Sequence, residues 1–198
     1  MRTYVQRARA DQRERTALAI ERAALRELGI RGYADLRLAD VAQRAGVALR
    51  TLYLHAPTKE ALVSAALGRR AVALARKVER WQPPEASAAA VLDDLVAYHE
   101  RTYRSDRQVL EVLELLVDSG APGGGALLRS LDRVRLQLIE RAMAMLARRG
   151  ALRVRPEHAA ALAHALLAYP TWRAALTGPA KRRAPALIAD ALRSSLLA

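Results

Sequence analysis

The segment Leu49–His55 carries the side chains with the clearest chemistry in the sequence. It offers an arginine, a threonine, a tyrosine and a histidine on a stretch that, as a helix, is small enough to enter the major groove of DNA. An arginine can pair with both O6 and N7 of a guanine, which is worth about 1–3 kcal/mol of base discrimination. Arg50 is therefore the strongest candidate for reading a base.

Two short predicted helices must position this segment, one over about 38–45 and one over about 49–55. A helix-turn-helix needs a small residue where its helices cross and a glycine where the chain reverses, and Ala42 and Gly46 meet these needs. If only these two positions matched, an ordinary helical hairpin with a glycine cap would be the simpler interpretation. Apolar positions on both sides of the turn favour the helix-turn-helix; they are Val41, Ala45, Val47 and Leu52.

Lys59 gives a second hint of a phosphate partner. Thr58 is a predicted N-cap, so Lys59 falls in the first turn of the following helix. A cation there opposes the helix dipole by about 0.3–1 kcal/mol, and a nearby DNA phosphate would reverse the sign. An exposed lysine also tolerates so small a penalty, so both interpretations stay open.

Helical periodicity dominates the chain, which predicts an all-α fold of about nine helices. A scaffold helix is expected over about 13–28, after a disordered arm at 1–12 whose arginines are candidates for a narrow minor groove. We expect residues 1–58 to form a three-helix head with the helix-turn-helix, and residues 59–198 to form a larger helical body.

Composition limits the possible environments and partners. The formal net charge is +13 and the pI is near 11.1, which favours a polyanionic partner, nucleic acid before membrane. A GC-rich coding bias would explain part of the arginine content equally well. With no cysteine, no signal peptide and no apolar run long enough to span a membrane, the sequence predicts a cytoplasmic protein.

The pattern around the predicted turn resembles the TetR family of bacterial regulators. The resemblance covers about Ile20 to Leu62, and the later part is recognisable only by its length and helical layout. It implies a DNA-binding head, a body with a ligand pocket, and dimerisation through the last two helices. The residues that carry it are Gly32-Tyr33, Val41-Ala42, Ala45-Gly46-Val47, Thr51-Leu52-Tyr53, and His55 followed by Pro57-Thr58-Lys59-Glu60-Ala61-Leu62.

The resemblance also implies roles for single residues. Leu49, Arg50 and Thr51 fall where family members contact bases or adjacent phosphates, and Ala48, directly before them, is also among the predicted DNA-binding residues. Three further positions, Tyr53, His55 and Lys59, fall where they hold the DNA backbone, and Arg37 is a further phosphate candidate. A solvated surface arginine is the commoner explanation for Arg37 taken alone.

Some positions depart from the family pattern. Leu36 and Arg37 stand where a Thr or Ser usually begins the second helix, Ala48 replaces the usual Ser before the third, and Ala56 replaces an aromatic residue. Loss of the Ser cap at Ala48 should cost about 1 kcal/mol.

Polar and aromatic groups within the apolar helices of the body are candidates for a small-molecule site. Most such residues in proteins are packed core residues with one satisfied polar tip, and we expect about a third of these to line a cavity. The sequence does not identify the ligand. The candidates are Tyr98, His99, Tyr103, Met143, His164, Tyr169 and Trp172.

The last two predicted helices supply the candidate dimer interface. The eighth, over about 156–176, is apolar around much of its circumference, and the ninth offers Leu187, Ile188, Leu192 and Leu196. A buried core within one monomer is the alternative. A dimer would place two recognition helices about 34–36 Å apart, to read a near-palindromic operator.

No pattern in the sequence indicates an enzyme, a metal site or a cofactor. The glycine-rich stretch 119–125 lacks the Lys-Ser/Thr end of a phosphate loop, and no serine stands in a nucleophile elbow. The competing hypothesis is a ligand-binding or interaction protein of the same fold that has lost specific DNA reading. Ligand-responsive repression remains the favoured prediction.

Overall fold

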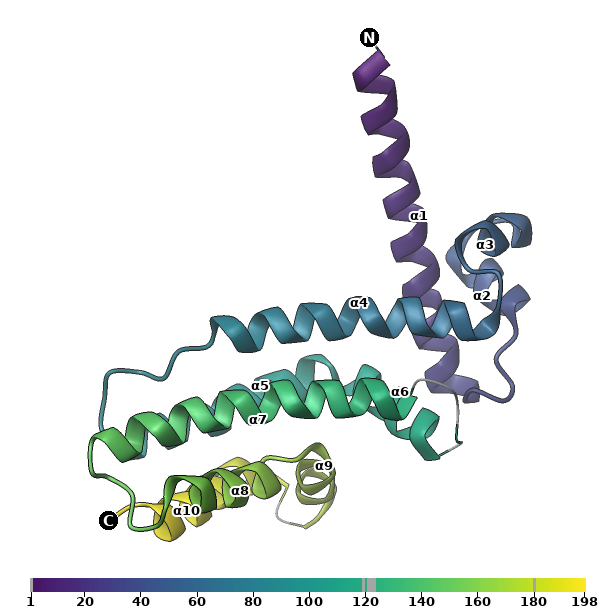
Figure 1. The fold of residues 1–198 in the computed structure, drawn as a ribbon. Helices are drawn as coiled ribbons and strands as arrows, with labels where there is room; N and C mark the ends of the chain where they lie inside the picture. The colour runs from purple at the N-terminus through teal and green to yellow at the C-terminus, as the bar shows by residue number, and fades with distance from the viewer. Residues whose placement is uncertain (1, 119, 121–123, 180) are drawn as a thin grey trace. The chain divides into compact units, whose positions relative to one another are not determined.

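The computed structural model describes residues 2–118, 120, 124–179 and 181–198, and the part of the chain that it describes is built from ten helices without a strand (Figure 1). The predicted all-α fold is confirmed. The helices are α1 (Arg2–Arg31), α2 (Leu38–Ala45), α3 (Leu49–His55), α4 (Lys59–Arg80), α5 (Ala88–Ser105), α6 (Arg107–Asp118), α7 (Gly124–Arg148), α8 (Pro156–Leu166), α9 (Tyr169–Thr177) and α10 (Ala184–Leu196).

The chain forms two compact units. The first comprises residues 1–73 and 108–129, and the second comprises 74–107 and 130–198. The boundary expected after residue 58 lies at the start of α4, whereas the two units divide within α4, after residue 73. Most of α6 belongs to the first unit, because Gln108 donates a hydrogen bond to the carbonyl of Leu25 in α1 (3.4 Å).

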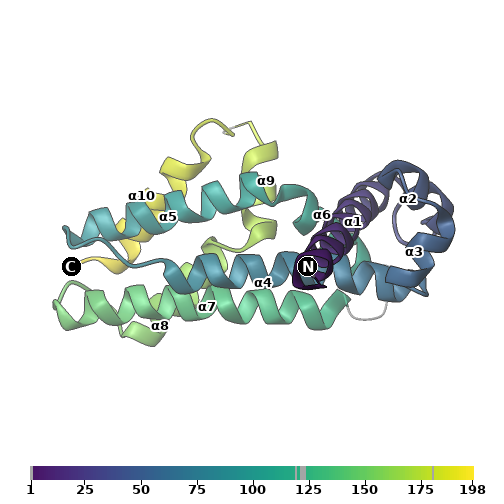
Figure 2. The same ribbon diagram turned by 90° about the horizontal axis from the view of Figure 1, so that it is seen from above.

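In the first unit, α2 and α3 lie on one side of α1 (Figure 2). The scaffold helix expected over about 13–28 lies within α1, and Ile20, Ala24 and Leu28 are buried. The structure differs from the sequence analysis before residue 13: α1 begins at Arg2, where a disordered arm was expected. The segment is rich in Arg, Ala and Gln, which are good helix formers, and an ion pair between Glu14 and Arg69 ties α1 to α4 (2.5 Å).

The core of the second unit forms around α5. This helix is capped by Ser87, whose hydroxyl accepts the amide of Ala90 (3.3 Å), and α10 packs against it with an ion pair between Arg193 and Asp93. None of the helices in the described ranges is both long and apolar enough to cross a membrane. The largest fully buried side chains of this unit include Trp172, Leu92, Leu95, Leu138, Ile139 and Met143.

The single eighth helix expected over 156–176 is instead two helices, α8 and α9. Pro170 is the second residue of α9. A proline lacks an amide hydrogen, and its ring clashes with the carbonyl four residues earlier, which here is that of Leu166. The helix therefore ends at Leu166, and a new one begins after Ala168.

Candidate nucleic-acid interface and aromatic cluster

The turn between α2 and α3 has the geometry that the glycine predicts. Gly46 has φ of +68°, in the left-handed region, which a glycine enters without the steric cost of a β-carbon. The amide of Val47 bonds to the carbonyl of Ala42 (3.0 Å), so two of the free carbonyl groups at the end of α2 find partners. Val41 and Ala42 are buried beneath the turn.

One face of α3 is anchored and the other is presented to solvent. Leu52 is fully buried, whereas the side chains of Leu49, Tyr53 and Leu54 are 40, 47 and 78% exposed. Among the remaining predicted contact residues, Arg37, Ala48, Arg50 and His55 are exposed and Thr51 is half-buried. Four of the five predicted contact residues of α3, Arg50 among them, are thus accessible to a partner.

The predicted loss of helix caps is confirmed. Neither Arg37 before α2 nor Ala48 before α3 makes a side-chain capping hydrogen bond. Ala56, which follows α3, is buried, so the small side chain at this position has neighbours of its own. With seven residues and no side-chain cap, α3 depends on the packing of Leu52 for its stability.

Lys59 has partners within the protein that neither earlier interpretation foresaw. Its ammonium group donates to the carbonyls of Tyr33 (2.8 Å) and Ala34 (3.0 Å) and lies 4.6 Å from the centre of the Tyr33 ring. The Tyr33 hydroxyl in turn donates to Glu60 (2.7 Å), and partial burial together with this bond raises the pKa of Tyr33 to about 12. The cost of a cation at this helix start is therefore offset by two carbonyl groups.

A buried carboxylate joins α1 to the helix-turn-helix. The side chain of Glu27 is only 3% exposed and accepts hydrogen bonds from Arg44 of α2 (2.5 Å) and from Arg31 (2.9 Å). The bond from Arg44 lowers the pKa of Glu27, so the group is a carboxylate at neutral pH. Arg31 also approaches Asp40 at 3.5 Å. This cluster fixes α2 on its scaffold helix.

The sequence analysis missed Glu27. The i, i+4 spacing of Glu27 and Arg31 is visible in the sequence and was a usable signal. The partner on α2 was not visible, because Arg44 lies 17 residues away in the chain.

In the second unit, five of the seven predicted ligand residues form one aromatic chain. Ring centres follow one another from Tyr98 to His99 (5.7 Å), His99 to Tyr103 (5.9 Å), and Tyr103 to both Tyr169 (5.4 Å) and Trp172 (5.9 Å). Burial lowers the pKa of His99 to about 4, so its imidazole is neutral, and it bonds through Nδ1 to a backbone carbonyl.

This aromatic cluster contains buried donors without partners. The indole nitrogen of Trp172 and the hydroxyl of Tyr98 make no hydrogen bond with any described residue. A buried donor left unsatisfied costs about 1–3 kcal/mol. These two groups, at the two ends of one chain of rings, give the cluster an unused capacity to bind acceptors.

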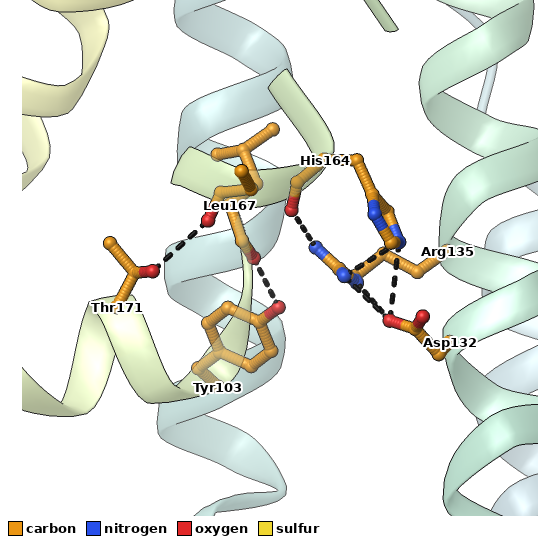
Figure 3. Close-up of polar contacts among 7 residues, drawn as sticks. Tyr103, Asp132, Arg135, His164, Leu167 and Thr171 are labelled. Atoms are coloured by element: carbon orange, nitrogen blue, oxygen red, sulfur yellow. Dashed lines mark hydrogen bonds and ion pairs between the residues drawn. The ribbon is translucent and has the colours of Figure 1, made fainter. Parts of the chain in front are cut away.

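Side chains from three helices close the break between α8 and α9 (Figure 3). Tyr103 donates to the carbonyl of Leu167 (2.5 Å), Arg135 to that of His164 (2.7 Å), and Thr171 to that of Ala165 (3.0 Å). Carbonyls that a continuous helix would have satisfied are thus satisfied by side chains.

The same view shows Arg135 held between His164 and Asp132 (Figure 3). Its guanidinium lies 2.7 Å from Nε2 of His164 and 2.5 Å from the Asp132 carboxylate, which itself is 3.2 Å from His164. Arg135 and Asp132 were not among the predicted residues, because a solvated i, i+3 pair is the ordinary explanation for their spacing.

Two grooves border these residues within the second unit. One, of about 530 Å³, is lined by Met143 and His164 with Glu140 and Glu157, so these two predicted residues share a site. The other, of about 440 Å³, is lined by Tyr98 with Trp81 and three cations. The predicted residues His99, Tyr103 and Trp172 are buried and line neither groove.

Comparisons with known proteins agree with this geometry. A sequence profile of the bacterial regulatory proteins of the tetR family matches residues 20–66. No curated protein matches the sequence.

Solved structures match over nearly the whole chain. SmeT, the repressor of the Stenotrophomonas maltophilia multidrug efflux pump SmeDEF, is 19% identical, with a TM-score of 0.67 over 92% of this chain and 90% of that one. A SmeT–triclosan complex gives a TM-score of 0.70 at 19% identity, covering 92% of each chain. FadR from Bacillus subtilis in complex with stearoyl-CoA is 16% identical, with a TM-score of 0.67 over 89% of this chain and 97% of that one.

The matched segment begins at the buried part of α1, includes the whole helix-turn-helix, and ends in α4. It contains the turn at Gly46 and the exposed face of α3 described above. Residues 20–66 therefore match the N-terminal domain of the tetR family of bacterial regulatory proteins, and the chain as a whole has the fold of the solved structures named above.

Proposed function

We propose that this protein is a ligand-responsive transcriptional repressor that binds a near-palindromic operator as a dimer. The observation that carries the proposal is α3, a short helix held by one buried leucine with Arg50 and its neighbours exposed. Such a helix fits the major groove. Arg50 would read a guanine, while Arg37, Ala48, Leu49, Thr51, Tyr53 and His55 would contact bases or phosphates beside it.

Lys59 has a different role in this proposal from the one that the sequence suggested. Its ammonium already holds the carbonyls of Tyr33 and Ala34. A phosphate contact from the same group would have to share these donors. Lys59 therefore acts mainly by fixing the loop before α2, through its bonds to two carbonyls of that loop.

Dimerisation is proposed through α8 and α10. Each presents a large exposed apolar side chain: Leu162 is 38% exposed and Leu187 is 46% exposed. Apolar side chains on two adjacent helices of one protomer suit an isologous four-helix interface. Sedimentation equilibrium at increasing protein concentration measures this association.

The effector site is proposed around the aromatic cluster. The unpaired donors of Trp172 and Tyr98 would each gain a hydrogen bond from a ligand acceptor, and His99, Tyr103, Met143, His164 and Tyr169 surround them or line the adjoining groove. Triclosan with SmeT and stearoyl-CoA with FadR show that structures with this fold hold small molecules. An effector releases DNA only if it prefers one of two conformations, with a coupling of about 1–3 kcal/mol.

A fragment-binding assay tests the proposal. Labelled genomic fragments, starting with the region upstream of the gene, are titrated with the wild type, with Arg50→Ala, and with Arg26→Ala as a control that removes another exposed arginine, on α1. We expect one fragment to be preferred, and Arg50→Ala to weaken that binding by about tenfold to a hundredfold, while Arg26→Ala does not. Equal binding to all fragments by all three proteins would instead support the ligand-binding protein that does not read DNA.

A further inference from the structure

The N-terminal half of α1 extends beyond α2 and α3 and is free of them (Figure 1). It is rich in arginine, and Arg7, Arg9, Arg13 and Arg15 are all exposed. A 30-residue helix holds these side chains in fixed directions, unlike a disordered arm. The direction of each arginine around the helix can therefore be compared with the direction of the helix-turn-helix.

Glu27 marks the side of α1 that faces the helix-turn-helix, because it bonds to Arg44 of α2. At 3.6 residues per turn, Arg9 lies 18 residues, or about five whole turns, before Glu27, and Arg13 lies 14 residues, or about 3.9 turns, before it. Both arginines therefore stand on the same side of α1 as α2, at about 27 and 21 Å along the axis.

The acidic residues of this half of the helix face elsewhere. Glu14 and Glu21 are both bound to Arg69 of α4. Asp11 lies 16 residues before Glu27, about 160° around the helix axis from it, and so on the opposite side of α1. Neither Arg9 nor Arg13 has an acidic partner in the described structure. The helix face on the side of the helix-turn-helix thus carries unopposed positive charge.

We propose that Arg9 and Arg13 bind DNA phosphates, which makes the N-terminal half of α1 a second DNA-contacting element beside α3. The inference rests on the proposed DNA-binding function. The major groove is about 12 Å wide, so side chains 21–27 Å along α1 from the Glu27–Arg44 contact are far enough away to reach backbone outside the groove that α3 occupies. These contacts position the protein and carry no base specificity.

The dependence of binding on salt tests this proposal. Each phosphate contact contributes about −0.9 to the slope of log K against log salt concentration, so Arg9→Ala/Arg13→Ala should reduce its magnitude by about 2. Over the fourfold range from 50 to 200 mM salt, wild-type binding should then weaken about twelvefold more than that of the variant. The probe is a random-sequence 30-base-pair duplex, which needs no known operator.

Arg15→Ala/Arg22→Ala is the matched control. It removes the same charge from two exposed arginines of the same helix, which lie about 120° and 140° around the axis from Glu27. We expect its slope to equal that of the wild type. Circular dichroism checks that all three proteins keep their helical content, which alanine should preserve.

Two results would overturn the proposal: an unchanged slope in Arg9→Ala/Arg13→Ala, or an equal loss in both double variants, which would indicate attraction by net charge alone. A failure of the proposed operator-binding function would give a different result. It would appear as no preference among genomic fragments, while the slope difference between the two double variants on the random duplex would remain.

Discussion

The head and the second unit place their distinctive side chains in opposite environments. On α3, Arg50, Tyr53 and His55 are exposed. In the second unit, His99 and Trp172 are almost completely buried and lie in a chain of aromatic contacts. The helix-turn-helix therefore presents an exposed surface that a large partner can cover, whereas the aromatic cluster is part of a packed core. A ligand of the cluster would have to bind the buried donors that have no hydrogen-bond partner.

Trp172→Ala should show the largest difference between the two regions. The side chain is fully buried, and removal of a buried aromatic costs about 3–5 kcal/mol. Urea unfolding measures this loss, with the exposed Tyr53→Ala on α3 as the counterpart, for which we expect less than about 0.5 kcal/mol. A small loss of unfolding free energy for Trp172→Ala would mean that Trp172 lines a cavity and is not a packed core residue. The two regions would then not differ in the way described.

His99 should make the second unit sensitive to acid. Its pKa is about 4 in the folded protein against 6.5 when solvated, so the unfolded chain binds more protons between these values, and stability falls as pH drops from about 6.5 to 4. The whole window is worth about 3 kcal/mol. Thermal unfolding across this range should show a shallower loss for His99→Gln; an identical pH profile would contradict a buried neutral imidazole.

Glu27→Gln should weaken the support of the head by about 1–3 kcal/mol at pH 7. The pKa of Glu27 is lowered in the folded state, so its stabilisation is present above the unfolded value of 4.5 and is lost as pH falls through the folded value. The difference between variant and wild type in urea unfolding should therefore shrink below pH 4.5. A constant difference would indicate lost packing instead of lost charge.

Ala48→Ser should have the smallest effect and the opposite sign. It supplies the side-chain cap that α3 lacks and should stabilise the helix by about 1 kcal/mol. Hydrogen exchange of the α3 amides is the sensitive measurement, with Ala39→Ser, at an exposed position within α2, as the control. Faster exchange in Ala48→Ser than in wild type would contradict the expected stabilisation of α3 by a side-chain cap.

The same comparison explains which features of the structure could be predicted from the sequence. The helix-turn-helix was predictable because its requirements are local: a glycine at a left-handed turn, a small residue at the crossing, and a buried leucine one turn later. The all-α class followed from periodicity. The helical start of α1 was missed because terminal segments are usually disordered, and the role of Lys59 was missed because its carbonyl partners lie about 25 residues away.

In the second unit, residue types alone gave the members of the aromatic cluster but not their arrangement. His99 and Tyr103, four residues apart, share one face of α5, which helical spacing predicts, and Tyr98 precedes His99 in the chain. Their meeting with Tyr169 and Trp172 depends on the path of the chain after the break at Leu167. The sequence predicted one continuous helix there, so it could not predict which rings would meet.

The break between α8 and α9 has a consequence for the order of folding. Tyr103 and the Leu167 carbonyl are 64 residues apart in the chain, and Arg135 and the His164 carbonyl are 29 residues apart. Contacts this distant form only after the loops between them have closed, which costs chain entropy. While the chain is still collapsing, the carbonyls of the break remain hydrated, so this junction should be among the last parts of the second unit to become protected from water.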